Sequence, residues 1–407
     1  MICRHCGFNV SLQLIDLGSA PPSNALVVET DDSHEPAYPL RVLVCEKCWL
    51  VQTEDFAAAD ELFTPDYAYL SGYSSTWVNH CKEYVESAVA DLSLSASDRV
   101  IEVATNDGTL LSFFAEAGMT CLGIEPTAAT ANVARSKGLD VVNEFLNLEV
   151  ATHIVEQWGP AELVVANNVL AHVPDINGFS RACKTLLAPD GVATFEFQHL
   201  LSLIKQGQFD TIYHEHFSYL SLGAAISVLS LAGLEVFDVE ELPTHGGSLR
   251  VHAKRDSSDA HDQMQSVEAM LTLEGDEGMW DPGFYLSFQA VAERCREGLN
   301  DFLVNSKQSG DLVVGYGAAA KGNTLLNFAK IDQGLLAYVV DRNPAKQGML
   351  LPGSGIPVVS EERLQKDQPD AVVVLPWNLA PEIQAQLGYV ADWGGSLLVA
   401  VPELREL

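Results

Sequence analysis

Short runs of β-branched residues alternate with helix-like segments from about residue 98 to about residue 255. This alternation predicts a parallel sheet with helices on both faces, built on strands at Arg99–Ala104, Cys121–Glu125, Leu163–Asn167 and Val192–Phe197. Two later runs, Leu234–Val239 and Ser248–Ala253, are separated only by a turn-like segment and predict an antiparallel hairpin at the edge of that sheet. The middle of the chain is therefore expected to be a doubly wound α/β domain.

A second α/β segment follows the first. Its expected strands are Leu312–Tyr316, Leu336–Asp341, Val358–Val359, Ala371–Leu375 and Leu397–Val401, with a helix that begins near Lys321. Between the two segments, residues 257–281 hold seven acids and no Lys or Arg, which predicts a solvated connector. Apolar residues then recur at helical spacing from about Phe284 to Ser306, which predicts a long amphipathic helix.

Four of the eight cysteines form two C-x-x-C pairs within the first 65 residues: Cys3, Cys6, Cys45 and Cys48. Four thiolates close a tetrahedral Zn²⁺ site and leave no open position, so the predicted zinc is structural. Buried cysteines without a metal, or a redox pair, are the alternatives, but neither pair follows the strand-to-helix pattern of a redox motif. A module of this size buries little core, so a bound metal would help it to fold.

Charge limits the partners of the chain. It carries 23 Lys and Arg against 55 Asp and Glu, a net charge of −32, so we expect neither nucleic acid nor an anionic membrane as a partner. The longest weakly polar stretch, Tyr219 to Leu234, is too short to span a bilayer, and the N-terminus lacks the apolar region of a signal peptide. We therefore expect a cytoplasmic protein, and a monomer.

Polar residues follow four successive strands of the first α/β segment, where a doubly wound sheet binds its ligand. The first turn lacks the G-x-G-x-x-G of a pyrophosphate site, and an acid about 20 residues further on can accept ribose hydroxyls. A cofactor with a ribose but no phosphate, S-adenosylmethionine (SAM), therefore fits better than NAD. The predicted cofactor residues are Glu102, Ala104, Asn106, Gly108, Glu125, Asn143, Phe145, Asn167 and Asn168.

A cluster of titratable groups stands at Tyr213-His214-Glu215-His216. Their pKa values suit proton abstraction near neutral pH. In an extended segment His214 and His216 share one face, and Tyr213 and Glu215 share the other. A metal site and a purely structural role remain as alternatives for this cluster.

The second α/β segment opens with a strand, a glycine turn and a helix start at Gly315-Tyr-Gly317-Ala-Ala-Ala-Lys321. Exposed N–H groups, the helix dipole and the Lys321 charge predict a phosphate site. The dinucleotide fingerprint is incomplete here too, so NAD chemistry is not favoured. Asp341, after the next strand, is either a ribose ligand or a turn cap.

Six motifs together resemble the SAM-dependent C-methyltransferases of deoxysugar biosynthesis: the cysteine pairs, the turn at 101–111, Asn167-Asn-Val-Leu-Ala-His172-Val-Pro, Tyr213-His-Glu-His-Phe-Ser-Tyr, His245-Gly-Gly-Ser-Leu-Arg and Gly315-Tyr-Gly-Ala-Ala-Ala-Lys-Gly-Asn-Thr. The resemblance implies a zinc-binding module (1–65), a Rossmann-like SAM domain (66–256) and a connector with a C-terminal Rossmann-like domain (257–407) that holds the substrate's nucleotide. It also implies methylation at C-3 of a nucleotide-linked 4-keto-6-deoxy sugar.

The same resemblance assigns roles to single residues. It implies that His216 is the general base and that His172, Tyr213 and Glu215 orient the sugar and polarise its ketone. It places Tyr67 at the cofactor, and Tyr69, His214, Lys321, Asn323 and Thr324 at the substrate. Two other classes remain open: an O- or N-methyltransferase acting on a nucleotide sugar, and a non-catalytic scaffold that binds SAM and zinc.

Overall fold

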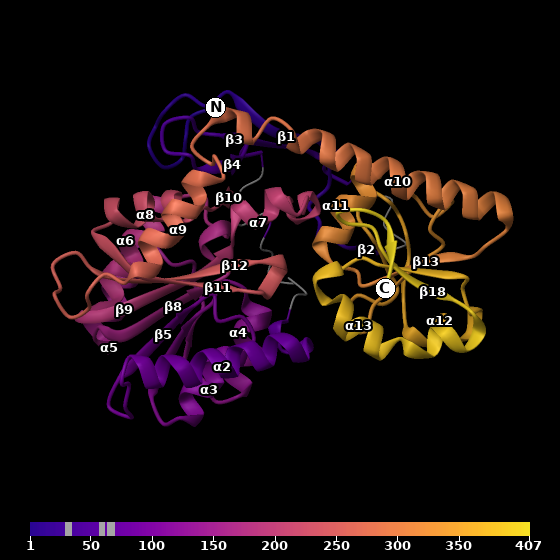
Figure 1. Ribbon diagram of the computed structural model, residues 1–407. Helices are drawn as coiled ribbons and strands as arrows, with labels where there is room; N and C mark the ends of the chain where they lie inside the picture. Colours follow the sequence, from indigo (N-terminus) through magenta and orange to yellow (C-terminus); the bar gives the residue numbers. More distant parts are fainter. Residues whose placement is uncertain (29–34, 57–61, 63–69) are drawn as a thin grey trace.

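The computed structural model describes residues 1–28, 35–56, 62 and 70–407. It has the predicted α/β architecture: a small cysteine-bearing module at the N-terminus lies against two α/β domains, each built on its own sheet (Figure 1). The boundaries after residues 65 and 256 remain predictions. Tyr67 and Tyr69 lie outside the described residues.

The central sheet has seven strands in the spatial order β11-β12-β9-β8-β5-β6-β7. Five of them are parallel, and the β11–β12 hairpin is antiparallel at one edge, as predicted. The strands are β5 (Arg99–Val103), β6 (Thr120–Ile124), β7 (Val141–Val142), β8 (Ala161–Asn167), β9 (Leu187–Gln198), β11 (Leu234–Leu242) and β12 (Ser248–Arg255).

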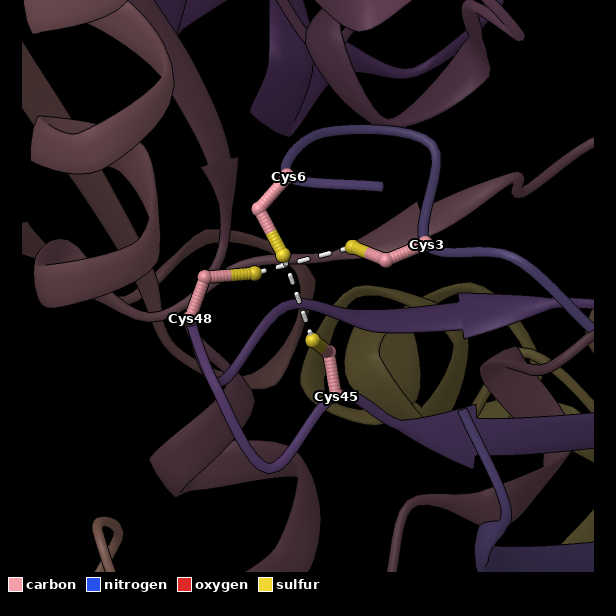
Figure 2. Close-up of side chains that lie close together, drawn as sticks. All are labelled: Cys3, Cys6, Cys45 and Cys48. Carbon is pink, nitrogen blue, oxygen red and sulfur yellow. Dashed lines mark hydrogen bonds between the residues drawn. The ribbon is translucent and has the colours of Figure 1, made fainter. Parts of the chain in front are cut away.

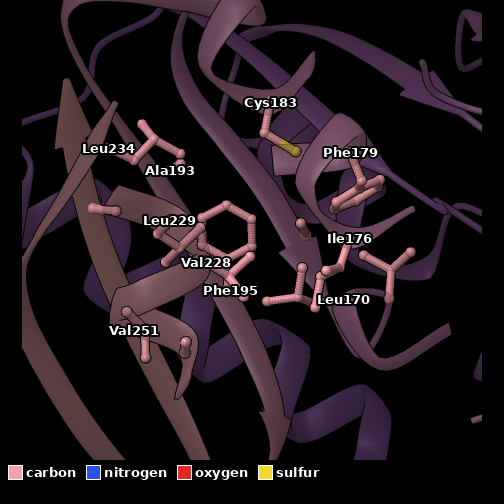
Figure 3. Packing of buried hydrophobic residues seen from close by; sticks show 14 of the residues in the cluster. Leu170, Ile176, Phe179, Cys183, Ala193, Phe195, Val228, Leu229, Leu234 and Val251 are labelled. Atoms are coloured by element: carbon pink, nitrogen blue, oxygen red, sulfur yellow. The ribbon is translucent and has the colours of Figure 1, made fainter. Parts of the chain in front are cut away.

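Helices cover both faces of this sheet because each presents one apolar stripe to it. One face packs on α2 (Ser75–Asp91), α3 (Thr109–Glu116) and α4 (Ala128–Ser136). The other packs on α5 (Leu148–Trp158), α6 (Ile176–Leu186) and α8 (Leu222–Leu231). Figure 3 shows this second core, where Phe179 and Cys183 of α6 lie near Phe195 of β9 and Val228 of α8.

The acidic connector differs from the prediction. Part of it is a helix, α9 (Gln265–Asp276), whose Val267 and Met270 are buried against the first domain. Glu274 of α9 is fully buried, accepts hydrogen bonds from His199 and from the backbone N–H of Leu222 and Gly223, and so caps the start of α8. The many acidic residues suggested a solvated segment, but α9 also has a short apolar stripe and one carboxylate, Glu274, with a structural role.

The C-terminal sheet has the order β16-β14-β13-β17-β18-β19. Its strands are β13 (Val313–Tyr316), β14 (Val339–Val340), β16 (Val358–Val359), β17 (Ala371–Val374), β18 (Ser396–Val399) and β19 (Arg405–Glu406). Two helices pack on each face: α10 (Phe288–Ser309) and α11 (Ala320–Ala329) on one, α12 (Glu361–Asp367) and α13 (Ala380–Gln386) on the other. The predicted long helix is α10, which extends from the N-terminal module along this domain (Figure 1).

The N-terminal module shares sheets with both domains. Its strands β1 (Leu12–Ala20), β3 (Tyr38–Val44) and β4 (Val51–Thr53) form a sheet with β10 (Ser218–Tyr219) of the first domain. Its strand β2 (Val27–Val28) pairs with β15 (Met349–Leu350) of the C-terminal domain. The remaining short helix, α7 (Leu200–Lys205), follows β9.

The four predicted cysteine ligands meet at one point in the module (Figure 2). Their sulfur atoms all lie within 4.8 Å of one another, and Cys3–Cys48 and Cys6–Cys45 are each 3.6 Å apart. A tetrahedral Zn²⁺ with Zn–S bonds of about 2.3 Å sets its sulfurs about 3.8 Å apart, so the cluster fits zinc. The side-chain amide of Gln52 also donates to the Cys3 sulfur at 3.3 Å.

We expect about one zinc per chain in purified protein. Cys45→Ser removes one of four ligands, so zinc content by mass spectrometry should fall to near zero and the melting temperature should fall with it, because structural zinc contributes directly to folding. Cys121→Ser, at a half-buried cysteine outside the cluster, is the matched control and should keep its zinc. A Cys45→Ser protein with a full zinc complement contradicts the four-thiolate site.

Candidate active site

A cavity of about 570 Å³ lies between the two α/β domains. One end is formed by the carboxyl ends of β5, β6 and β8. The other is formed by the N-terminus of α11, by Lys346 and by the segment around η6 (Trp377–Leu379). The segment 211–220 and the tip of the β11–β12 hairpin line the space between them. A ligand in this cavity therefore touches both domains.

The turn after β5 holds its shape through backbone strain and one carboxylate. Ala104 and Asn106 have left-handed backbone angles, with φ of 56° and 52°. Non-glycine residues adopt this region at a cost, and such residues concentrate at functional sites. Glu125, at the end of β6, accepts the Asn106 N–H at 2.9 Å and also binds Thr127. Its carboxylate thus shapes the turn as well as lining the cavity.

Two asparagine side chains at the end of β8 have polar atoms available to a ligand. The side-chain amide group of Asn167 and the amide nitrogen of Asn168 are buried, with no hydrogen-bond partner among the described residues. Both residues line the cavity, and so does Phe145, which is 44% exposed and offers an aromatic face. Amide groups, an acid and an aromatic ring suit a nucleoside, so these residues fit the adenosyl part of SAM.

Three other predicted cofactor residues, Asn143, Gly108 and Glu102, support or form the wall of the cavity. Asn143 does not appear among the lining residues; its amide donates to the carbonyls of Glu125 and Pro126 at 2.7 and 2.9 Å. Gly108 starts α3 with φ of 75°, and a Cβ there would lie 2.4 Å from Leu139. Glu102 lines the cavity and accepts the Thr105 hydroxyl and the Leu111 N–H, and burial raises the pKa of this carboxyl to about 8.

The Tyr-His-Glu-His segment is not extended, which corrects the expected pairing of faces. A tight turn at 214–215, closed by a hydrogen bond from the His216 N–H to the Tyr213 carbonyl at 2.9 Å, brings Tyr213 and His216 to the same side. Their rings lie 4.0 Å apart, and the ring of His172 lies 4.5 Å from His216. All three line the cavity.

The surroundings of His216 keep its imidazole neutral. Its Nδ1 lies 2.8 Å from the Thr211 carbonyl, which fixes the proton on Nδ1 and leaves the lone pair on Nε2. Burial and the neighbouring His172 hold the pKa of His216 well below its usual value, and burial lowers the pKa of His172 to about 4. The His172 Nδ1 is held in the same way by the Glu215 carbonyl, at 2.8 Å.

His214 and Glu215 face away from the cavity. The His214 Nε2 lies 3.2 Å from the Tyr38 carbonyl in the N-terminal module. Glu215 is buried and accepts the side-chain N–H of Asn24 at 3.1 Å, and burial raises the pKa of its carboxyl to about 7. Neither is among the lining residues, so in this arrangement both support the wall.

Two lysines face the cavity from the C-terminal domain. Lys321 donates to the Asn378 side chain at 2.7 Å and lies 4.5 Å from the centre of the Trp377 ring. Burial lowers its pKa to about 8, and buried Asp210 opposes that shift. Lys346 donates to the Ala318 carbonyl at 2.7 Å. With the N-terminus of α11 they form a positive end to the cavity.

The neighbours of Lys321 in the sequence are placed differently. Asn323 is buried, and its side-chain amide has no hydrogen-bond partner among the described residues. The Thr324 hydroxyl donates to the Ile212 carbonyl at 3.0 Å. Neither lines the cavity, so α11 presents Lys321 and its own first turn to a ligand. Asp341 accepts the Ala318 N–H at 2.8 Å and the Asn343 N–H at 2.8 Å, as a turn cap does.

Among the lining residues to which sequence reasoning gave no role are Trp77, His245 and Lys346. His245 stands in a motif that carried the resemblance, so a signal for it was present. Trp77 and Lys346 belong to no motif, and only the folded chain brings them to the cavity.

Comparison with known proteins agrees with this layout. Three family models match in succession: a zinc-binding domain (residues 3–63), a methyltransferase domain (77–239) and a C-methyltransferase C-terminal domain (243–402). The C-methyltransferase NovU of Streptomyces niveus is 35% identical over 404 residues, which are 99% of this chain and 96% of NovU. The chain belongs to the C-methyltransferase family.

Other similarities are partial. The ubiquinone biosynthesis O-methyltransferase of Bordetella avium is 34% identical over 99 residues, 24% of this C-methyltransferase and 41% of that protein. The structure of magnesium protoporphyrin IX methyltransferase from Synechocystis with bound SAM shares 16% identity, over 50% of this chain and all of that one, at a TM-score of 0.37. This likeness is too low to carry an argument. Family membership makes SAM the methyl donor and zinc the ion of the four-cysteine site.

None of the helices that the structure describes combines the length and the apolarity that a membrane crossing requires.

Gly108 tests how tightly the cofactor turn is packed in this C-methyltransferase. Gly108→Ala adds a methyl group 2.4 Å from Leu139 at a positive φ, so we expect a loss of about 1–3 kcal/mol of unfolding free energy and weaker SAM binding. Gly138→Ala, also at positive φ but with nothing within 4 Å, is the control. It should lose less stability and keep its SAM affinity by calorimetry. Equal effects of the two variants contradict the steric reason.

Proposed function

We propose that this C-methyltransferase acts at C-3 of a nucleotide-linked 4-keto-6-deoxy sugar. The observation that carries the proposal is the neutral imidazole of His216, whose Nδ1 is held by the Thr211 carbonyl. Carbon has no lone pair, so a carbon acceptor must first lose a proton to a base of this kind. An oxygen or nitrogen acceptor makes a smaller demand on the base.

His216 Nε2 takes the C-3 proton, and the electron pair of the C–H bond moves toward the C-4 carbonyl oxygen to give an enolate. Bound SAM would supply an electrophilic methyl group: C-3 would bond to it as the methyl–sulfur bond breaks, S-adenosylhomocysteine leaves and the C-4 carbonyl re-forms. His172 and Tyr213, whose rings lie 4.5 and 4.0 Å from that of His216, hold the base and orient the sugar. We keep Glu215 as a positioning residue, through its carbonyl bond to His172.

The other end of the cavity suits the diphosphate of the nucleotide. Lys321 and Lys346 both line it beside the first turn of α11, so a dianion meets two cations and a helix N-terminus. This arrangement gives a chain of net charge −32 a local place for an anion. Asn167, Asn168, Glu125 and Phe145 remain our proposal for the cofactor end, with Tyr67 and Tyr69 carried forward from the resemblance.

We also propose that the enzyme is a cytoplasmic monomer without nucleic-acid or membrane partners. None of the eight cysteines, all of which are among the described residues, forms a disulfide, as in proteins of reducing compartments. Gel filtration with light scattering tests the monomer.

The test of the function is deuterium exchange at sugar C-3 in D₂O, on a panel of dTDP- and GDP-linked 4-keto-6-deoxy sugars, with and without SAM. Exchange on one sugar, together with a product that is one methyl group heavier, supports C-3 methylation and identifies the nucleotide. Methyl transfer without exchange points to a heteroatom acceptor. Neither signal on any sugar overturns the proposal.

His216→Asn should lower turnover by at least 10²-fold, because a positioned base contributes about 10²–10⁴. SAM affinity should stay within a factor of three of wild type. His153→Asn, the same change at an exposed histidine of α5, is the matched control and should keep full turnover. If His216→Asn keeps more than a tenth of the wild-type rate, His216 is not the base.

Anion binding should fall with rising pH at the Lys321 end. A lysine with a pKa of about 8 carries its charge below pH 8 and loses it above. We therefore expect the affinity for dTDP, measured by calorimetry, to weaken between pH 7 and pH 9. Lys321→Ala should bind at least tenfold more weakly at pH 7, whereas Lys366→Ala, at an exposed lysine of α12, should bind as wild type does. Unchanged dTDP affinity in Lys321→Ala contradicts this site.

A further inference from the structure

The tip of the β11–β12 hairpin brings a third histidine to the cavity wall. His245 lines the cavity together with His172, His216 and Lys321. It has no part in the base described above, and no hydrogen bond from any described residue reaches either of its ring nitrogens. Its ring instead packs against Trp77, with centroids 5.6 Å apart. The polar atoms of this imidazole are thus left for a ligand.

The backbone of His245 is strained and firmly held. Its φ of 53° lies in the left-handed region, which a histidine adopts at a cost. The next two residues also have positive φ, 87° and 113° at Gly246 and Gly247. The surrounding chain fixes this shape, because the carbonyls of His245, Gly246 and Gly247 accept hydrogen bonds from Gln198, Gln208 and the His199 N–H at 3.3, 2.7 and 3.0 Å.

Close packing adds to this restraint. A Cβ at Gly246 would lie 2.5 Å from the Gln208 amide nitrogen and 2.6 Å from the Trp377 ring. Trp77, which the His245 ring contacts, packs in turn on His80, whose Nε2 lies 2.9 Å from buried Glu196. Contacts on both sides therefore hold the hairpin tip in place. In this strained conformation the His245 side chain lies at the cavity wall.

The charge state of His245 suits a hydrogen-bond donor. Burial and the nearby Lys321 charge lower its pKa to about 4, so the ring is neutral near pH 7 and carries one N–H. A neutral imidazole donates this N–H to a developing oxyanion without first drawing a proton from solvent. The base role is already filled by His216, and enolate formation requires a donor at the carbonyl oxygen.

We propose that His245 donates a hydrogen bond to the substrate's carbonyl oxygen and stabilises the negative charge that forms there when His216 removes the adjacent proton. This inference rests on the proposed function. His216 gains the carbon-bound proton, the freed electron pair moves onto the oxygen, and His245 keeps its own proton throughout. When the new C–C bond forms, the methyl–sulfur bond of SAM would break and S-adenosylhomocysteine would leave; the carbonyl is then restored and His216 releases its proton to water.

The test uses His245→Gly in the full-length zinc-loaded enzyme, because glycine relieves the positive φ and leaves an imidazole-sized space. We expect C-3 deuterium exchange and kcat both to fall about 10²–10³-fold. SAM affinity should stay within threefold, and the melting temperature should equal or exceed that of wild type. Added imidazole should restore at least tenfold of the lost exchange rate, and His245→Asn, which keeps an N–H donor, should be intermediate.

Several results would overturn the inference. Exchange at the wild-type rate in His245→Gly removes His245 from enolate formation. A rise in KM with unchanged kcat makes it a binding residue only, and a lowered melting temperature without imidazole rescue makes it structural. Absence of exchange in the wild-type enzyme overturns the proposed function and this inference together, whereas exchange in wild type with no change in the variant overturns this inference alone.

Discussion

Asp210 is a buried carboxylate, and a hydrogen bond to one of its oxygens joins the two α/β domains. It lies in η3 (Phe209–Thr211) of the first domain and accepts the Trp377 indole N–H of the second at 2.7 Å. Trp377 in turn lies under Lys321. Burial opposes both charges, since it raises the pKa of Asp210 to about 6 and lowers that of Lys321 to about 8, yet at neutral pH both remain ionised. This cluster thus links the two domains that form the walls of the cavity.

Strain in the backbone collects around the same cavity. Four of the eight non-glycine residues with positive φ in the described chain line it: Ala104, Asn106, Asn168 and His245. They come from three different strand ends, so their grouping does not follow from one local turn sequence. Each is held by neighbours, as Asn106 is by Glu125 and Asn168 by the Glu196 carbonyl. Conformations that are costly in isolation persist where the surrounding fold determines them, and here that place is the ligand site.

The architecture could be predicted from the sequence because the spacing of apolar residues indicates which positions are buried. Most strands of both sheets, the edge hairpin, the long helix α10 and the four cysteines were predicted from spacing, whereas β19 (Arg405–Glu406) was not. The sequence was insufficient where side chains meet only through tertiary contact. The turn at 214–215 reverses the expected partner of His216, and an acid count hid the apolar stripe of α9. Lys346 reaches the cavity from a loop that no local pattern distinguishes. The single-residue roles therefore stay predictions, while the fold does not.

The sheet that the N-terminal module shares with the first domain connects the zinc site to the segment that carries His216. Strand β10 begins two residues after His216 and pairs with β4, which ends five residues beyond Cys48. Thr53 of β4 donates its hydroxyl to the His216 carbonyl at 2.8 Å, and its N–H to the Phe217 carbonyl. The backbone next to His216, the proposed base, thus forms an edge of the sheet that carries the zinc site. Loss of the zinc would therefore disturb the segment that carries His216 as well as the module itself.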